Sequence, residues 1–227
     1  MRSEDFKQIK YEKEENGILT VTLNWPERKN ALSPLGLLEL IYAVEHAEKD
    51  SDVKVMILTG CEEAGAFSSG GYFSHEMLKE IPEEYRKEIN LRDMASKKLC
   101  LKYWDFSKPI IAAINGLAVG GGFTFPVICA DLVYMAEEAW WALFFVKRAV
   151  MPDFATTVLL PLFIGINKAK ELFYFGDRMT AHDAERLGLV NKVLPKDELM
   201  PFVREQAFKL IPPKGPSLSI KLMKKTI

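Results

Sequence analysis

The chain has 227 residues, of which 48% are hydrophobic and 27% are charged, and its formal net charge is −1. This composition is typical of a globular protein with a large apolar core, and the balanced charge excludes a broad basic surface for nucleic acid or an anionic membrane. The three cysteines are far apart and predict neither a disulfide framework nor a metal site. The polar N-terminus and the lack of a run of about 20 apolar residues predict a cytoplasmic protein without a signal peptide or membrane span.

The N-terminal half of the chain alternates apolar and polar segments. Ser33 followed by Pro34 predicts the start of a helix, because serine is a good N-cap and proline is favoured at the first helical position. The segment 53–59 becomes continuously apolar, as buried parallel strands do. In chain order we predict strands at 9–14 and 18–23, a loop at 24–30, the helix from Ser33, the strand at 53–59, a small-residue loop at 60–71 and a mostly helical region at 73–104.

The C-terminal half repeats the alternation. Thr180 and Asp183 have the spacing of a capping box and predict a helix that ends at Gly188. In chain order we predict strands at 109–114, 132–135 and 190–194, an apolar helix up to Ala130, and further helices from Asp153 and at 167–176, 196–211 and 216–226. This pattern predicts an α/β fold, with a core domain at 1–195 and a C-terminal helical segment at 196–227.

Two loops of small residues each follow a predicted buried strand, one ending at Gly70-Gly71 and one at Gly120-Gly121-Gly122. Ligands usually bind at the carboxyl ends of parallel strands. Glycine lets backbone N–H groups approach a ligand closely, and the second loop leads into a helix N-terminus, which favours negative charge. Two such loops can direct one N–H each at a single oxygen, although tight turns would explain the glycines equally well. Dinucleotide, P-loop and G-x-S-x-G signatures are missing.

Four motifs occur in order: Asn24-x-Pro26-x3-Asn30-Ala31-Leu32, 66–71, 113–122 and 170–190. Together they resemble the crotonase (enoyl-CoA hydratase/isomerase) superfamily over roughly residues 7–226. The resemblance implies a crotonase (ClpP-like) fold of repeated ββα units, with helices packed on the sheets and a C-terminal helical region. It also implies an acyl-CoA substrate, no separate cofactor because coenzyme A is part of the substrate, no metal, and a homotrimer or a dimer of trimers. Neither nucleic acid nor a membrane is an expected partner.

The resemblance assigns site residues by their positions in these motifs. It implies that the oxyanion-hole amides belong to Gly71 and Gly121 and that Ser69 lies near the adenine of coenzyme A. Arg28 and Lys29 are phosphate-contact candidates, although a solvated surface explains them equally well. The other candidate substrate or coenzyme A contacts are Phe67, Tyr72, Thr124 and Phe145.

The acid–base residues decide which reaction such a site performs. The two glutamates of family hydratases align with Thr124 and Phe145, so a standard hydratase mechanism is not predicted. Asp153 aligns with the segment in which peroxisomal-type Δ3,Δ2-enoyl-CoA isomerases carry their single catalytic glutamate. We therefore predict that Asp153 moves a proton from C2 to C4, with a pKa raised by burial. The alternative role for Asp153 is that of a helix N-cap.

Other functions remain open at this point. In the 4-chlorobenzoyl-CoA dehalogenase branch an aspartate at this position is a nucleophile, and an aryl/acyl-CoA hydrolase or dehalogenase would use Asp153 in that way. The aromatic run Trp140, Trp141, Phe144 and Phe145 would then line an aryl pocket, but the histidine base that this branch requires is missing. A hydratase with a non-standard base and an inactive acyl-CoA-binding scaffold are the remaining alternatives. His75 and Glu76 face either the acyl group or the surface.

Overall fold

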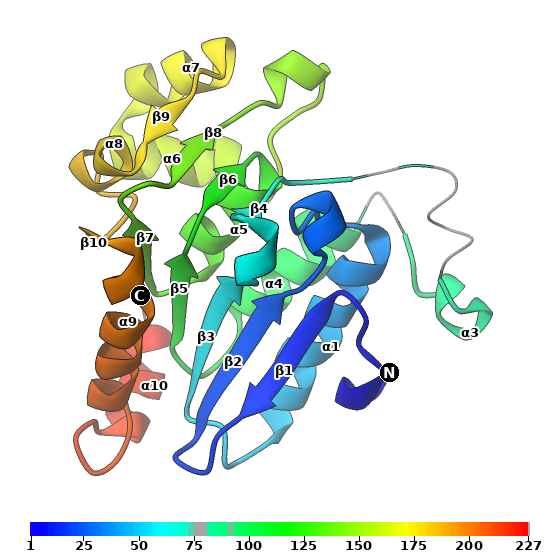
Figure 1. Ribbon diagram of the computed structural model, residues 1–227, viewed down its shortest axis with the longest axis vertical. Helices are drawn as coiled ribbons and strands as arrows, with labels where there is room; N and C mark the ends of the chain where they lie inside the picture. Colours follow the sequence, from blue (N-terminus) through cyan, green and yellow to red (C-terminus); the bar gives the residue numbers. More distant parts are fainter. Residues whose placement is uncertain (73, 75–80, 91–92, 227) are drawn as a thin grey trace.

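The computed structural model describes residues 1–72, 74, 81–90 and 93–226 (Figure 1). Its larger sheet has six strands in the order β1-β2-β3-β5-β7-β10. β1 and β2 form an antiparallel hairpin, and the remaining neighbours pair in parallel, which confirms the α/β class. The bounds of these strands are β1 Ile9–Lys13, β2 Ile18–Leu23, β3 Val55–Gly60, β5 Ile110–Ile114, β7 Leu132–Ala136 and β10 Lys192–Leu194.

A second, four-stranded sheet has the order β4-β6-β8-β9. Because β4 follows β3 and β6 follows β5, this small sheet continues from the carboxyl ends of the central strands of the large one (Figure 1). Loops were predicted at the positions of β4 and β6, and no strand was predicted at 140–142 or 179–180, since strands of two or three residues are too short to show a period. Their bounds are β4 Ala66–Ser68, β6 Leu117–Val119, β8 Trp140–Ala142 and β9 Met179–Thr180.

Helices cover the large sheet. α1 (Pro34–Lys49) contacts β1 and β2, and α9 (Lys196–Leu210) lies across β3, β5 and β7. The Ser33 hydroxyl accepts a hydrogen bond from the Gly36 amide at 3.1 Å, which confirms the predicted N-cap of α1. The capping box at Thr180 is also confirmed. The other helices are α3 Glu83–Arg86, a π-helical turn Met94–Leu99, α4 Cys100–Trp104, α5 Gly121–Cys129, α6 Thr156–Ile164, α7 Ile166–Phe175, α8 Ala181–Arg186 and α10 Ser217–Lys224, with short 3-10 turns at Ser3–Asp5, Pro26–Arg28, Glu62–Ala64 and Val146–Arg148.

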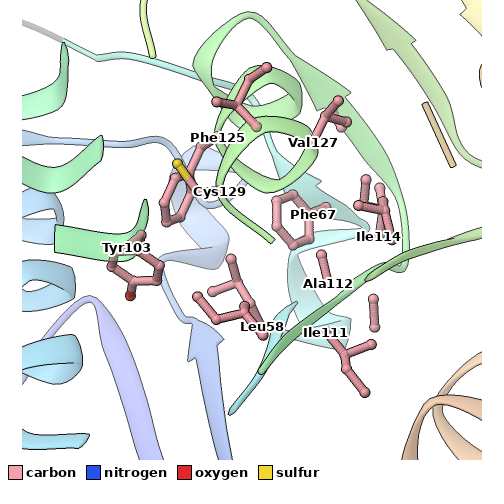
Figure 2. Close-up of a cluster of buried hydrophobic side chains, with 14 of the residues drawn as sticks. Leu58, Phe67, Tyr103, Ile111, Ala112, Ile114, Phe125, Val127 and Cys129 are labelled. Carbon is pink, nitrogen blue, oxygen red and sulfur yellow. The ribbon is translucent and has the colours of Figure 1, made fainter. Parts of the chain in front are cut away.

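One large apolar core joins the two sheets and the helices. Every residue of β3 and β5 is buried, and the side chains around them come from β4, α4 and α5 (Figure 2). Phe125 of α5 packs edge-on against Tyr103 of α4, with ring centroids 4.9 Å apart. Buried residues of α9 belong to the same core, so the C-terminal helical segment packs on the predicted core domain. This packing fixes the start of α5, where Gly121 lies.

A buried carboxylate ties the N-terminal strand to α1. Glu39 of α1 is fully buried, and its two oxygens accept hydrogen bonds from the backbone amides of Lys7, Gln8 and Ile9 at 2.8–3.1 Å. A carboxylate is a strong acceptor for such amides, and removing it would leave them unpaired.

Candidate active site

The two glycine loops meet at the carboxyl ends of β4 and β6, where their backbones touch. A Cβ atom on Gly70 would lie 2.3 Å from the carbonyl oxygen of Val119, and one on Gly122 would lie 2.4 Å from the carbonyl oxygen of Ser68. Gly70 also has a φ of +88°, which other residues rarely adopt. Glycine is therefore required at both positions by the approach of the loops to each other, in addition to any role in ligand binding.

The amides of Gly71 and Gly121 lie in neighbouring loops, and neither has a hydrogen-bond acceptor among the described residues. Gly71 pairs with Leu32 through a parallel bridge, in which the Leu32 amide donates to the Gly70 carbonyl and the Tyr72 amide donates to the Leu32 carbonyl. The N–H of Gly71 itself takes no part in that bridge. Gly121 is the first residue of α5, and the first amides of a helix have no intrahelical partner. Within the described part of the chain neither amide donates a hydrogen bond, as an oxyanion hole requires.

Asn30 fastens the loop 24–32 to β4. Its side-chain oxygen accepts from the Trp25 amide at 2.8 Å, and its side-chain amide donates to the Ala66 carbonyl at 2.9 Å. The Asn30 carbonyl in turn accepts from the Ser68 hydroxyl at 2.7 Å. The residue is buried and has a φ of +53°, a conformation that asparagine tolerates better than most residues. Asn30 appears in the sequence only as part of a motif, and no role was predicted for it, because the hydrogen-bond partners of Asn30 lie up to 38 residues away in the chain.

Four of the predicted coenzyme A contacts lie together at the rim beside Gly71. The Ser69 hydroxyl donates to the Arg28 carbonyl at 3.0 Å, and the Arg28 guanidinium lies 5.2 Å from the centre of the Tyr72 ring. Lys29 is adjacent and exposed. Trp25, which the sequence analysis did not single out, packs edge-on against Tyr72. The rim thus combines two cationic side chains with two aromatic rings, a combination that suits a phosphorylated nucleotide.

Asp153 lies against the second glycine loop. Its Oδ2 atom would be 2.9 Å from a Cβ atom on Gly121, and its Oδ1 accepts a hydrogen bond from the Thr124 hydroxyl at 2.7 Å. The predicted start of a helix at Asp153 is wrong, and so is the alternative that this side chain is an N-cap. α6 begins at Thr156 without a side-chain cap, and the preceding Phe154 and Ala155 have positive φ angles. This irregular turn directs the Asp153 carboxylate toward Thr124 and the glycine loop.

The environment of Asp153 makes it a base near neutral pH. Burial disfavours the charged carboxylate and raises its pKa to about 6, while the hydrogen bond from Thr124 acts in the opposite direction. The Thr124 hydroxyl also lies 3.3 Å from the Gly120 carbonyl. It can therefore donate a hydrogen bond to ionised Asp153, or donate to the Gly120 carbonyl and accept a hydrogen bond from neutral Asp153. Thr124 was predicted to contact the substrate, and the structure places it as the buried partner of the carboxylate.

The other predicted site residues are distributed between the site and the core. The Phe145 ring would lie 3.7 Å from a Cβ atom on Gly120 and so forms a wall beside the second loop. Phe67 is fully buried among core side chains (Figure 2). His75 and Glu76 lie outside the described residues. Within those residues no cluster of three or more His, Cys, Asp or Glu side chains is arranged to hold a metal ion.

The aromatic run before Asp153 does not form one pocket. Trp141 is fully buried and stacks on Phe123, with ring centroids 4.2 Å apart. The Arg178 guanidinium instead lies over the Trp140 ring, with its central carbon 4.2 Å from the ring centre. The two tryptophans therefore have different surroundings, and Phe145 is the aromatic residue of this run that is placed next to a glycine loop.

Comparison with known proteins gives the family. The model of the enoyl-CoA hydratase/isomerase family matches residues 13–227. The chain belongs to the enoyl-CoA hydratase/isomerase family. It is 34% identical to the short-chain-enoyl-CoA hydratase of Clostridium acetobutylicum over 213 residues, which are 94% of this chain and 78% of that protein. It is 32% identical to the crotonyl-CoA hydratase of Syntrophomonas wolfei over 219 residues, which are 96% of this chain and 80% of that protein.

The fold agrees with that family. The structure of the enoyl-CoA hydratase from Bacillus anthracis superposes with a TM-score of 0.83 at 30% identity, covering 96% of this chain and 81% of that chain. This likeness confirms the predicted crotonase fold. None of the helices described for the present chain is long and apolar enough to cross a membrane.

The substitution Asn30→Asp tests how the first glycine loop is held. Aspartate keeps the shape and the acceptor for the Trp25 amide but loses the donor to Ala66 and buries a charge. We expect a loss of about 2 kcal/mol or more in the free energy of unfolding, measured by urea denaturation, and faster hydrogen exchange at residues 66–71. The control is Asn191→Asp, because exposed Asn191 uses only its acceptor oxygen, toward the Val133 amide. Equal stability of the two variants would contradict this role.

Thr124→Val tests the origin of the Asp153 pKa. Valine has nearly the shape of threonine but cannot donate, so the larger of the two hydrogen bonds that lower the pKa is lost and the pKa of Asp153 should rise above 6. Thr124→Ser should leave it near 6. The measurement is the pH titration of the Asp153 carboxyl carbon by NMR in both variants. An unchanged pKa in Thr124→Val would show that this hydrogen bond does not tune the carboxylate.

Proposed function

We propose that the protein shifts the double bond of an acyl-CoA thioester from the Δ3 to the Δ2 position. The observation that carries the proposal is the partly buried carboxylate of Asp153, whose pKa is raised to about 6 and which lies beside Gly121, whose amide donates no hydrogen bond to any described residue. A 1,3-proton shift requires one group that alternates between base and acid near neutral pH. It also requires stabilisation of the enolate oxygen, for which the Gly71 and Gly121 amides are available.

In the proposed reaction Asp153 acts first as the base and then as the acid. Its carboxylate removes a proton from C2, the C2–H electron pair moves into the C1–C2 bond, and the carbonyl π pair moves onto the thioester oxygen, which then carries the negative charge facing the amides of Gly71 and Gly121. As the thioester carbonyl re-forms, the C1–C2 π pair moves into the C2–C3 bond, and the C3–C4 π pair takes the proton from neutral Asp153 at C4. The double bond has then moved from C3–C4 to C2–C3. Thr124 serves both stages, because its hydroxyl donates to the carboxylate and accepts from the acid.

Hydration of a Δ2 double bond is the second candidate, supported by the hydratase names of the curated relatives. Water addition needs a base for the water and an acid for C2. In this chain the two positions that align with the hydratase glutamates are Thr124 and Phe145. Asp153 would then have to activate water by itself, with Thr124 orienting it. The site therefore favours isomerisation over hydration, and it favours both over an aryl- or acyl-CoA hydrolase with Asp153 as nucleophile.

The substitution Asp153→Asn tests the proposed base. It retains the size of the side chain and an acceptor for Thr124 but cannot take a proton. We expect wild type to convert 3-hexenoyl-CoA into 2-hexenoyl-CoA, and the variant to lose about 10²- to 10⁴-fold in kcat, as followed by HPLC. Asp177→Asn is the matched control, because this exposed aspartate lies outside the site and should leave kcat unchanged.

The same assay includes crotonyl-CoA. If wild type hydrates crotonyl-CoA and leaves 3-hexenoyl-CoA unchanged, the isomerase proposal is wrong and the hydratase candidate replaces it. If neither substrate reacts although acyl-CoA binds, the protein is an acyl-CoA-binding scaffold.

We also propose that the protein is a homotrimer or a dimer of trimers. α6 and α7, which pack against each other, expose several large apolar side chains, and apolar patches on a surface mark interfaces. Together with the family resemblance, this face supports association between copies of the chain. Its members are Val158, Leu162, Phe163, Ile166, Tyr174 and Phe175, each between 48% and 75% exposed.

Leu162→Glu tests the assembly by placing a charge in the middle of this apolar face. We expect wild type to have the mass of a trimer or hexamer by light scattering after size exclusion, and the variant to shift to monomer. Leu218→Glu is the control, since Leu218 on α10 has a similar exposure, 71% against 75%. A monomeric wild type would contradict the proposed assembly, as would equal dissociation of both variants.

A further inference from the structure

A surface pocket lies at the opposite edge of the large sheet from the glycine loops. It has a volume of about 360 Å³ and is lined by the end of α1, the segment 51–54 that leads into β3, the segment 107–109 that leads into β5, and the start of α10. The glycine loops follow the carboxyl ends of the same two strands. Because β5 rises about 3.3 Å per residue, the two edges are roughly 20 Å apart. The pocket is therefore separate from the candidate active site.

The pocket carries an excess of positive charge. Four lysines line it, Lys49, Lys54, Lys108 and Lys221, against one carboxylate, Glu48. Glu48 is occupied by Ser107, whose amide and hydroxyl both donate to it at 3.0 Å. Within the described part of the chain none of the four ammonium groups forms an ion pair. The whole chain has a net charge of −1, so this local excess does not follow from composition.

Two of the lysines are held in place by backbone carbonyls. The Lys108 ammonium donates to the carbonyls of Ala47 and Asp50 at the end of α1, and the Lys54 ammonium donates to the carbonyl of Ser51. Carbonyl contacts orient an ammonium group without neutralising it. Burial is the main cause that lowers the pKa of Lys108; the carboxylates of Glu48 and Asp50 act in the opposite direction, and the neighbouring charges of Lys221 and Lys54 lower the pKa further. A bound anion would relieve the part of this effect that comes from the neighbouring lysines.

The start of α10 adds an unpaired hydroxyl. Ser217 is the first residue of this eight-residue helix and lines the pocket. Its hydroxyl oxygen is buried and has no hydrogen-bond partner among the described residues. The N-terminal amides of a helix favour a nearby anion. This feature adds to the lysine cluster, and Val53, Pro109 and Leu218 provide apolar surface in the same pocket.

We propose that this pocket binds the phosphate group of a small phosphorylated metabolite at a site separate from the acyl-CoA site. Lysine ammonium groups bind phosphate as point charges, and several of them around one cavity suit a group with two negative charges. The pocket volume lies in the range of small-molecule sites, and the apolar wall fits the organic part of a phosphate ester.

The test is isothermal titration of the full chain with inorganic pyrophosphate and with AMP at low ionic strength. We expect both probes to bind wild type and to bind at least 10-fold more weakly to Lys54→Gln/Lys221→Gln. The control double variant, Lys10→Gln/Lys170→Gln, removes the same charge at exposed positions outside the pocket and should bind like wild type. Lys221→Gln alone gives a milder variant, because its ammonium makes no described hydrogen bond.

Hydrogen exchange gives a second measurement. Bound pyrophosphate should slow amide exchange at residues 217–221 in wild type and in Asp153→Asn, since the pocket does not depend on the active site. Failure of both probes to bind wild type would overturn the proposal. Equal weakening in the two double variants would also overturn it, because binding would then reflect only the overall charge. Binding of pyrophosphate but not AMP would limit the site to inorganic anions and contradict the metabolite class.

Discussion

Direct backbone contact between two loops is the constraint on which the rest of the structure depends. The segment that contains Gly70 lies against Val119, and Gly122 lies against Ser68, at distances that leave no space for a Cβ atom on either glycine. This contact brings the end of β4 next to the start of α5. The amides of Gly71 and Gly121, which have no acceptor in the described part of the chain, are neighbours because of it, and Asn30 and the core packing of α5 hold the two sides in place.

The chemistry follows from what surrounds this contact. Asp153 is placed by an irregular turn with two positive φ angles, in a buried environment that raises its pKa to about 6. A carboxylate with this pKa is mostly ionised at pH 7 and is still a stronger base than an exposed aspartate. The cationic groups nearby, Arg28 and Lys29, lie at the exposed rim and do not pair with Asp153. The site therefore keeps its only described carboxylate free to exchange a proton, while the rim is suited to phosphates.

Much of the fold was predictable because its signals are local. The hairpin at 9–23, the Ser33 cap and the Thr180 capping box depend on residues close together in the chain, and the structure confirms each. The small sheet was missed because its strands have only two or three residues and pair with distant segments. The start of α6 was placed three residues too early, since Pro-Asp before an apolar run resembles a helix start.

In the site, too, features that depend on neighbouring residues were predictable, and contacts between distant residues were not. The family resemblance predicted roles for Gly71, Gly121 and Asp153, but it gave no partner for Asp153. Its hydrogen bond to Thr124 spans 29 residues and joins α5 to the turn before α6. The fastening role of Asn30 likewise depends on a conformation and on partners in β4 that a single sequence does not reveal.

The most direct test of the account is the fate of the proton at C2. With 3-hexenoyl-CoA deuterated at C2 and the full-length protein in ordinary water, NMR and mass spectrometry of the product follow the label. One buried carboxylate that carries the proton both ways predicts 2-hexenoyl-CoA with a measurable fraction of the deuterium at C4. Formation of 3-hydroxyhexanoyl-CoA without this isomer, or an isomer that contains no deuterium at C4, would contradict it.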